Sequence, residues 1–294
     1  MISEQRIGLL GAGLMGKPVA RRLAAAGYAV SVWNRSVNKA RELEKQGVAI
    51  VTSPAQLIAE NEVIICLLSD EQACNEVLFT ESTLKAAGQN TVIIMMSTLS
   101  PEIVIGQQKK VQQLQINYID MPVSGGTRGA ENGTLSLMAG GKAEHIDALR
   151  PLLSHLGKVT RVGDVGAGQL TKLANQIIVA GTLSLLSEAF TLAQKGGADP
   201  VQVREALLGG FADSTLLQQQ GERMVQQDFT ARGPAKWQLK DTRSTVALAK
   251  ELGLTLPVTE TVNTLFSQMI DAGDGELDHC AVIRQIQRLN GLYP

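Results

Sequence analysis

The sequence predicts a doubly wound α/β domain over residues 1–163, followed by an all-helical domain over residues 164–294. Three observations predict this arrangement. Short apolar strands alternate with helical stretches in the first half. Long helical stretches replace them in the second half. A glycine-rich link, Gly163-Asp164-Val165-Gly166-Ala167-Gly168, lies between the two halves.

The strands expected in the first half are short, apolar and rich in β-branched residues. They are Arg6–Leu10, Ala29–Trp33, Val63–Leu68, Thr91–Met95, Tyr118–Met121, Leu135–Ala139 and Val159–Val162. Helices are expected over Pro18–Ala26 and Lys39–Gln46, because a glycine directly follows each stretch as a stop signal. Apolar strands separated by helices favour a parallel sheet that is covered on both faces.

Helical patterns in the second half cover Leu170–Lys195, Pro200–Leu208, Gln238–Leu252 and Glu260–Asp271. The first of these is the most apolar long stretch of the chain. It contains Asn175, Gln176 and Glu188, whereas a membrane span needs about 20 residues with almost no polar groups. We therefore expect a buried helix of a globular domain and no membrane association.

The bulk composition excludes several other classes. With 27 basic and 28 acidic residues, the chain lacks the basic excess of a nucleic-acid-binding protein. Its three cysteines are odd in number and lack metal-ligand spacing, so neither a disulfide framework nor a metal site is expected. The N-terminus has no signal-peptide pattern. A cytoplasmic location is the resulting expectation.

A glycine motif directly follows the first predicted strand. Gly11-Ala12-Gly13-Leu14-Met15-Gly16 has the spacing G-x-G-x-x-G and leads into a predicted helix. In a Rossmann-type sheet the first glycine permits the tight turn, the second admits a pyrophosphate, and the third lets helix and strand pack closely. The helix N-terminus then offers free N–H groups to the phosphates. The context of strand, loop and helix predicts a dinucleotide site.

The end of the second predicted strand indicates which dinucleotide is preferred. Enzymes that use NAD usually place Asp or Glu there to bind the ribose hydroxyls. This chain has Asn34-Arg35-Ser36, with Lys39 nearby. A neutral Asn34 does not repel a 2′-phosphate, and the Arg35 guanidinium and Ser36 hydroxyl are suited to bind one. NADP(H) is therefore the predicted cofactor, with NAD(H) as the alternative.

Four ordered segments carry a resemblance to a known family. They are Ile7-Gly8-Leu9-Leu10-Gly11-Ala12-Gly13-Leu14-Met15-Gly16-Lys17-Pro18, Asp120-Met121-Pro122-Val123-Ser124-Gly125-Gly126, Gly166-Ala167-Gly168-Gln169-Leu170-Thr171-Lys172-Leu173-Ala174-Asn175-Gln176 and Lys240-Asp241. Together they resemble the β-hydroxyacid dehydrogenases, the 3-hydroxyisobutyrate dehydrogenase family. The resemblance extends from the first strand to the last helices. It implies reversible hydride transfer between a nicotinamide cofactor and a small 3-hydroxy or 3-oxo acid.

Lys172 is the candidate for the proton-transfer group of this reaction. Reducing an aldehyde requires a proton for the developing alkoxide, and a shielded lysine close to a second cation has a pKa lowered toward neutrality. Lys240 is a candidate for that second cation. The resemblance implies that Lys172 is the active lysine and that Lys240 lies at the edge of the cofactor.

The remaining candidate residues follow predicted strand ends. The Ser124 hydroxyl and the backbone N–H groups of Gly125 and Gly126 suit a substrate carboxylate, and the resemblance implies the same role. By resemblance Thr98 lies near the nicotinamide ribose. Leu67 and Leu68 end a strand on the cofactor side.

Two questions stay open from the sequence alone. Many family members carry Asn four residues after the active lysine; here that position is Gln176, and Asn175 precedes it. Either side chain can reach the face of the lysine and hold the substrate hydroxyl.

The second question is the substrate. The stretches 171–179, 209–214 and 277–279 most resemble members that reduce tartronate semialdehyde (2-hydroxy-3-oxopropionate) to D-glycerate. The alternatives are 3-hydroxyisobutyrate, succinic semialdehyde or serine as substrate, and, from a different class, a dinucleotide sensor without catalysis. The apolar helical domain predicts contact with another subunit, through the long helix from about Leu170, and the resemblance implies a homodimer or homotetramer.

Overall fold

The computed structural model describes residues 5–292. Contacts gather the chain into two compact units, residues 1–172 and 173–294. The division falls inside the long helix α8 (Ala167–Lys195), whose first residues belong to the first unit. The boundary expected between residues 163 and 164 stays a prediction, because one helix contributes to both units.

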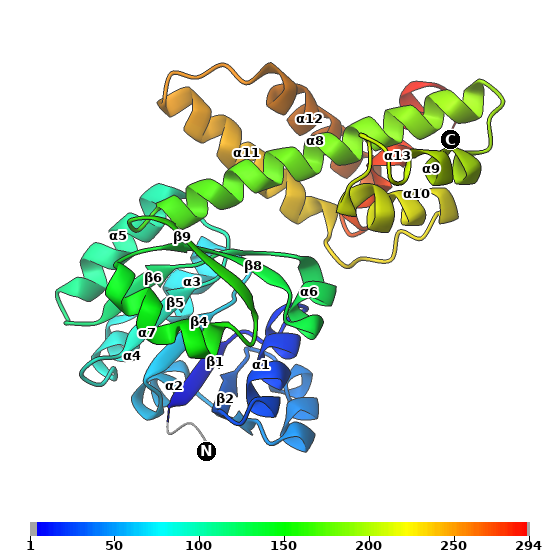
Figure 1. Cartoon of the computed structure of the whole chain (residues 1–294). Helices are drawn as coiled ribbons and strands as arrows, with labels where there is room; N and C mark the ends of the chain where they lie inside the picture. The colour runs from blue at the N-terminus through cyan, green and yellow to red at the C-terminus, as the bar shows by residue number, and fades with distance from the viewer. Residues whose placement is uncertain (1–4, 293–294) are drawn as a thin grey trace. The chain divides into compact units, whose positions relative to one another are not determined.

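The first unit contains a nine-stranded sheet (Figure 1). Six strands lie parallel in the order β3 (Ala49–Ile50), β2 (Ala29–Trp33), β1 (Arg6–Leu10), β4 (Val63–Cys66), β5 (Val92–Met95) and β6 (Asn117–Asp120). The strand order reverses between β1 and β4. In doubly wound sheets this reversal creates a crevice beyond the carboxyl ends of the strands, where ligands bind.

The last three strands differ from the expected all-parallel sheet. β8 (Leu135–Gly140) pairs antiparallel with both β6 and β7 (Val123–Ser124), and β9 (Gly157–Gly163) pairs parallel with β8. The connection between β7 and β8 is shorter than the crossover of about a dozen residues that parallel neighbours require. The chain therefore turns back on itself there, and the sheet is mixed.

Helices cover both faces of this sheet, as expected. Side chains alternate between the faces along each strand, so β4 directs Val63 and Ile65 into one core and Ile64 and Cys66 into the other. The first core is closed by α1 (Gly16–Ala25), α6 (Gly126–Asn132) and α7 (Ala143–Leu153). The second is closed by α2 (Pro54–Glu60), α3 (Glu71–Val77), α4 (Glu81–Lys85) and α5 (Pro101–Gln112).

One expected α-helix is replaced by tighter turns. Instead of a helix over 39–46, the chain forms two 3₁₀ segments, η1 (Val37–Lys39) and η2 (Arg41–Gln46). The residues of this stretch that reach the core are Ala40 and Leu43, three positions apart. A 3₁₀ turn repeats every three residues and so aligns them on one side.

The second unit is all-helical, as expected. Besides the rest of α8 it contains α9 (Pro200–Leu207), η3 (Leu217–Gly221), α10 (Glu222–Gln226), α11 (Ala235–Glu251), α12 (Pro257–Met269), η4 (Ile270–Asp274), η5 (His279–Ala281) and α13 (Val282–Leu289). By length and composition α8 could cross a membrane, but 44% of its most apolar window is buried within the protein. Leu183 and Phe190 of α8 lie in the core of this unit, as in the central helix of a globular domain.

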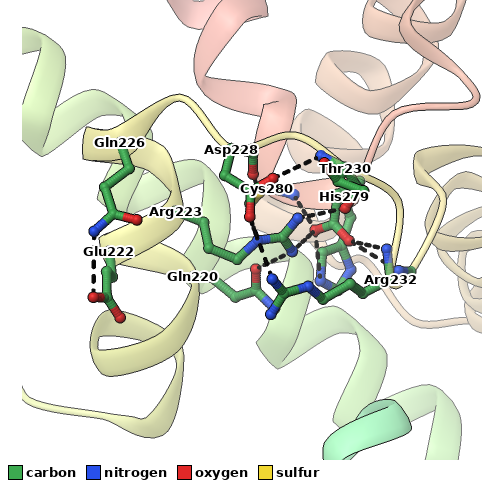
Figure 2. Close-up of polar contacts among 11 residues, drawn as sticks. Gln220, Glu222, Arg223, Gln226, Asp228, Thr230, Arg232, His279 and Cys280 are labelled. Carbon is green, nitrogen blue, oxygen red and sulfur yellow. Dashed lines mark hydrogen bonds and ion pairs between the residues drawn. The ribbon is translucent and has the colours of Figure 1, made fainter.

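A buried ion pair fixes the loop between α10 and α11 (Figure 2). Nη1 of Arg223 lies 2.9 Å from Oδ1 of Asp278, and both side chains are almost fully buried. Oδ2 of Asp278 accepts hydrogen bonds from the backbone amides of Arg232 (2.8 Å) and Gly233 (2.9 Å). Asp278 therefore connects α10, this loop and the start of η5.

Candidate active site

Most residues predicted for the cofactor site lie at one edge of the first unit's sheet, because each follows the carboxyl end of a parallel strand. The glycine loop follows β1, Asn34-Arg35-Ser36 follows β2, Leu67 and Leu68 follow β4, and Thr98 lies shortly after β5. β1 and β4 flank the reversal in strand order, so the loop lies where such sheets bind dinucleotides.

The glycine loop has the shape that the motif requires. Gly11 adopts a φ of +106°, and a Cβ there would overlap the carbonyl oxygen of Leu67. A Cβ on Gly16 would overlap the carbonyl oxygen of Gly11, so both positions exclude a side chain. A Cβ on Gly13 would meet no atom within 4 Å. The backbone is thus open to a pyrophosphate at Gly13, beside the start of α1, and these residues fit a dinucleotide.

Asn34 has a structural role in addition to its predicted one. Its Oδ1 accepts a hydrogen bond from the backbone N–H of Ala12 at 2.9 Å, and its Nδ2 donates to the carbonyl of Ser36 at 2.8 Å. The side chain therefore links the end of β2 to the glycine loop. It also fixes the turn that carries Arg35.

The cations around this turn differ in their pairing. Lys17 and Arg21 both contact Glu42, at 2.9 Å and 2.8 Å, and Lys17 contributes most to lowering the pKa of the Glu42 carboxyl. Arg35 and Lys39 are exposed and form no ion pair within the described residues. Their charges are thus available to an anion at the end of β2.

The segments after β4 and β5 are joined by a side chain that the motifs did not indicate. Oγ of the buried Ser97 accepts a hydrogen bond from the backbone N–H of Leu68 at 2.8 Å and donates to the carbonyl of Cys66 at 3.3 Å. The backbone N–H of Leu67 donates to the carbonyl of Leu10 at 2.9 Å. These bonds hold Leu67 and Leu68 beside the end of β1.

The start of α8 is attached to the same edge of the sheet. Gln169 is fully buried; its Oε1 accepts from the backbone N–H of Leu99 at 3.0 Å, and its Nε2 donates to the carbonyl of Ser97 at 2.9 Å. These partners flank Thr98 on either side. Lys172 follows on the same helix with only 9% of its surface exposed. A shielded lysine is thus held in a helical turn that lies against the end of β5.

Asp120, at the end of β6, also contacts the start of α8. Its side chain is fully buried, and its two oxygens accept from the backbone N–H groups of Gly166 (3.0 Å) and Gln169 (2.8 Å). Burial raises the pKa of this carboxyl to about 6, against the opposing effect of the hydrogen bonds. Asp120 belongs to one of the quoted motifs, but no role was predicted for it.

Ser124-Gly125-Gly126 forms the turn from the end of β7, through Gly125, into the start of α6. β7 runs in the same direction as β6, because both are antiparallel to β8, so its carboxyl end points to the same side as the other strand ends. Gly125 and Gly126 are exposed, and Gly125 precedes the first turn of α6. The turn therefore presents backbone N–H groups to solvent.

Asn175, Gln176 and Lys240 form one polar cluster in the second unit. Nδ2 of Asn175 donates to Oε1 of Gln176 at 2.9 Å, and Nε2 of Gln176 donates to Oδ2 of Asp241 at 2.7 Å. The other oxygen, Oδ1 of Asp241, lies 3.4 Å from Nζ of Lys240. The Gln176 amide is thus occupied on both sides, by Asn175 of α8 at its Oε1 and by Asp241 of α11 at its Nε2, whereas Oδ1 of Asn175 is not used by these bonds.

Sequence reasoning missed three organising side chains: Asp120, Gln169 and Asp241. Each lies inside one of the quoted motifs, but no role was predicted for it. The available signal was a polar residue beside an apolar strand or helix face. Such a residue is costly to bury unless it is hydrogen-bonded. Within residues 5–292, no group of three His, Cys, Asp or Glu side chains is placed to hold a metal ion.

Comparison with known proteins agrees with these features. The model of the NAD binding domain of 6-phosphogluconate dehydrogenase matches residues 6–166. The model described as the NAD-binding domain of NADP-dependent 3-hydroxyisobutyrate dehydrogenase matches residues 166–286.

Whole-chain relatives agree with the two family models. The chain is 39% identical to 2-hydroxy-3-oxopropionate reductase of Escherichia coli, covering 96% of this chain and 97% of that protein. It is 33% identical to the probable 3-hydroxyisobutyrate dehydrogenase-like 3 of Arabidopsis thaliana, covering 99% and 90%. The crystal structure of a Salmonella typhimurium 3-hydroxyisobutyrate dehydrogenase shares the fold, with a TM-score of 0.89 at 24% identity over 96% of this chain and 99% of that one.

Proposed function

We propose that this chain, which belongs to the 3-hydroxyisobutyrate dehydrogenase family of NAD(P)-dependent oxidoreductases, reversibly reduces tartronate semialdehyde to D-glycerate. The family membership follows from the two matching models and the relatives. The 39% identity to a 2-hydroxy-3-oxopropionate reductase over nearly the whole chain favours this substrate among the small acids of the family.

The observation that carries the catalytic proposal is the position of Lys172. The residue is only 9% exposed, and Gln169 ties the preceding turn of its helix to the strand end beside Thr98. A nicotinamide dinucleotide held by the glycine loop would supply the hydride for the aldehyde carbon. Lys172 donates a proton from Nζ to the developing alkoxide, and in the reverse direction it accepts the proton of the hydroxyl.

The turn Ser124-Gly125-Gly126 is proposed to bind the substrate carboxylate. Its two glycines are exposed at the end of β7, so their backbone N–H groups are accessible to an anion, and the Ser124 hydroxyl adds a further donor. Binding through the carboxylate would orient the aldehyde, but it does not distinguish the candidate acids, which all carry this group. The rest of the pocket would have to distinguish them, and one methyl group contributes only about 1–3 kcal/mol to such discrimination.

Asn175 is the better candidate for the substrate hydroxyl, and this narrows the choice that the sequence left open. The Gln176 amide is occupied by Asn175 on one side and by Asp241 on the other. Gln176 is therefore proposed to hold Asp241, and through it Lys240 at the cofactor's edge. Asn175→Ala should raise the KM for the acid, whereas Gln176→Ala should instead weaken cofactor binding.

NADPH is proposed as the preferred cofactor, because Arg35 and Lys39 are exposed and unpaired within the described residues at the end of β2. A phosphate there would gain charge-assisted hydrogen bonds from the Arg35 guanidinium. Arg35→Ala should lower kcat/KM for NADPH by about tenfold or more, while kcat/KM for NADH changes little. A wild-type preference for NADH would contradict this assignment.

The chain is further proposed to form a homodimer or homotetramer in the cytoplasm. Ile178, Leu185 and Leu192 are spaced seven residues apart on α8 and are 66%, 65% and 76% exposed. Residues with this spacing lie along one side of a helix, and large apolar side chains there favour contact with another subunit. Light scattering of Leu185→Glu should give a smaller particle than the wild type.

One assay tests the catalytic proposal. NADPH oxidation is followed with tartronate semialdehyde, with succinic semialdehyde and methylmalonate semialdehyde, and in reverse with D-glycerate, 3-hydroxyisobutyrate and serine. Lys172→Ala should lower kcat by about 10²–10⁴-fold and leave NADPH binding nearly unchanged. Full activity of Lys172→Ala would refute the role of this lysine, and tight NADPH binding without turnover of any substrate would favour a dinucleotide sensor.

A further inference from the structure

The start of α8 is capped by a residue from a different element. Asp164 precedes the helix in sequence and is of the type that usually caps one. Its side chain is 95% exposed and pairs instead with Arg161 at 3.0 Å. Asp120, from the end of β6, takes the place of a local cap by accepting the backbone N–H groups of Gly166 and Gln169. The position of the helix start is therefore set by the sheet.

Two glycines leave room for this carboxylate. A Cβ on Gly140 would overlap Oδ1 of Asp120, and a Cβ on Gly168 would lie 2.6 Å from its Oδ2. Gly140 pairs with Asp120 between β6 and β8, so the carboxylate is enclosed by β6, β8 and the first turn of α8. A longer side chain, or any side chain at either glycine, would displace it.

The helical turn held in this way is the one that precedes Lys172. Gln169 contributes both a backbone N–H to Asp120 and a side-chain amide to Ser97 and Leu99. Lys172 lies three residues after Gln169 and hence on the same side of the helix. A shift of the helix by one residue would rotate Lys172 by about 100° and move it by about 1.5 Å.

We propose that Asp120 is a positioning residue of the reaction: its carboxylate fixes the first turn of α8 and so the site from which Lys172 transfers its proton. The inference rests on the proposed function of Lys172. Asp120 itself does not need to touch the substrate or the cofactor. A misplacement of about 1 Å at a reacting group lowers turnover by about 10²-fold, so the capping bonds have a large effect on rate.

The primary test compares Asp120→Asn with Asp164→Asn. The first variant preserves shape but removes the charge and leaves one backbone N–H without an acceptor; the second makes the same chemical change at the exposed aspartate beside the helix. Asp120→Asn should lower kcat by about 10- to 100-fold, with the Kd for NADPH within about twofold of wild type. Asp164→Asn should leave both constants unchanged. An unchanged kcat, or an equal loss of NADPH affinity, in Asp120→Asn would overturn the proposal.

A double-mutant cycle separates this inference from the proposed function. If Asp120 acts through Lys172, adding Asp120→Asn to Lys172→Ala should not reduce the residual single-turnover rate further. A full additional loss in the double variant would show that Asp120 acts independently. If Lys172→Ala alone retains full activity, the role of the lysine fails, whatever Asp120→Asn does.

A structural readout accompanies the kinetics. Hydrogen exchange of the amides from Gly166 to Lys172 should become faster in Asp120→Asn, and the remainder of α8 should keep its protection. Unchanged exchange in this segment would contradict the capping role. If Asp120→Asn does not fold, Asp120→Glu serves in its place. It keeps the charge, but its extra methylene has no room between Gly140 and Gly168, so kcat should still fall while NADPH affinity is retained; a wild-type kcat would overturn the proposal.

Discussion

Asp120 in the first unit and Asp278 in the second are both fully buried, and both accept hydrogen bonds from backbone N–H groups, yet the pKa values of their carboxyls shift in opposite directions. Burial would raise the pKa of Asp278, but the charges of His279 and Arg223, together with the hydrogen bonds, lower it below its ordinary value. No cation of the described residues pairs with Asp120, so burial raises its pKa to about 6. The two carboxyls therefore differ in pKa because Asp278 has a paired cation, whereas Asp120 has none among the described residues.

The difference concerns stability as well as titration. A carboxylate whose pKa is lowered in the folded state stabilises the fold at neutral pH, whereas one whose pKa is raised destabilises it. For Asp120, the rise from 3.8 to about 6 corresponds to about 3 kcal/mol at neutral pH. A buried charge that reduces stability is more typical of a functional position than of a structural one.

The largest expected effect is the loss of stability when the paired site is broken. Asp278→Asn removes the shorter of the two ion pairs of Arg223, a residue that is 5% exposed, and leaves only the half-buried Asp228 at 3.3 Å. We expect the free energy of unfolding to fall by about 3–5 kcal/mol. Asp120→Asn removes a buried charge that has no cation, and we expect a change of no more than about 2 kcal/mol in either direction. Urea unfolding of both variants checks this; equal losses would remove the distinction between the two sites.

The two carboxyls should also respond to pH over different ranges. Because the folded pKa of Asp120 is raised, its contribution to stability decreases as pH rises from about 4 to about 6 and is constant above. Because the folded pKa of Asp278 is lowered, its contribution is complete above about pH 4 and is lost as pH falls further. Unfolding curves between pH 4 and 7 for wild type and Asp120→Asn should differ in slope. Parallel curves would contradict the raised pKa.

Turnover should follow the same titration. Other titratable groups on the elements around Asp120 are Tyr118, whose pKa is raised well above its ordinary value by burial, the exposed pair of Arg161 and Asp164, and Lys172. The phenol therefore stays neutral in this range. We expect kcat to decline below about pH 6, where Asp120 becomes protonated and the cap weakens. In Asp120→Asn this acidic decline should be absent.

The smallest effect is expected from an exposed ion pair. Lys236 contacts Glu276 at 2.6 Å, and the two side chains are 40% and 80% exposed. Such pairs contribute about 0–1 kcal/mol, because solvent screens them and the side chains lose freedom. Lys236→Ala should therefore change the free energy of unfolding far less than Asp278→Asn. A loss above about 2 kcal/mol would show that the distance between the charges, rather than their burial, determines how much an ion pair contributes to stability.

Local patterns accounted for much of the fold. β1, the glycine loop and β2 were predictable because apolar runs and glycine stop signals occur within a few residues of one another. The antiparallel direction of β8 was not predictable, since it depends on pairing between distant strands. The 3₁₀ turns over residues 37–46 were not predictable either, because the spacing of the buried Ala40 and Leu43 places them on one side of an α-helix as well as of a 3₁₀ turn.

The candidate site was predictable to a lesser degree. The motifs indicated the residues that would face a ligand, and the structure brings the glycine loop, Asn34 and Leu67 to one sheet edge. It did not follow from sequence that Asn34 holds the glycine loop or that Asp120 caps a helix 46 residues away. Both contacts join segments that are distant in sequence, so no local periodicity encodes them.

The close packing of Gly140 and Gly168 around the Asp120 carboxylate affects what mutational scanning of this chain would find. Gly140 and Gly168 have no side chain to offer a ligand, yet alanine at either position would overlap or crowd a buried oxygen of Asp120. A scan by growth or turnover should score both glycines as intolerant, and a map of intolerant positions would then include residues that contact no substrate. Screening the same library for expression and NADPH retention would separate these positions from those that bind the ligand directly.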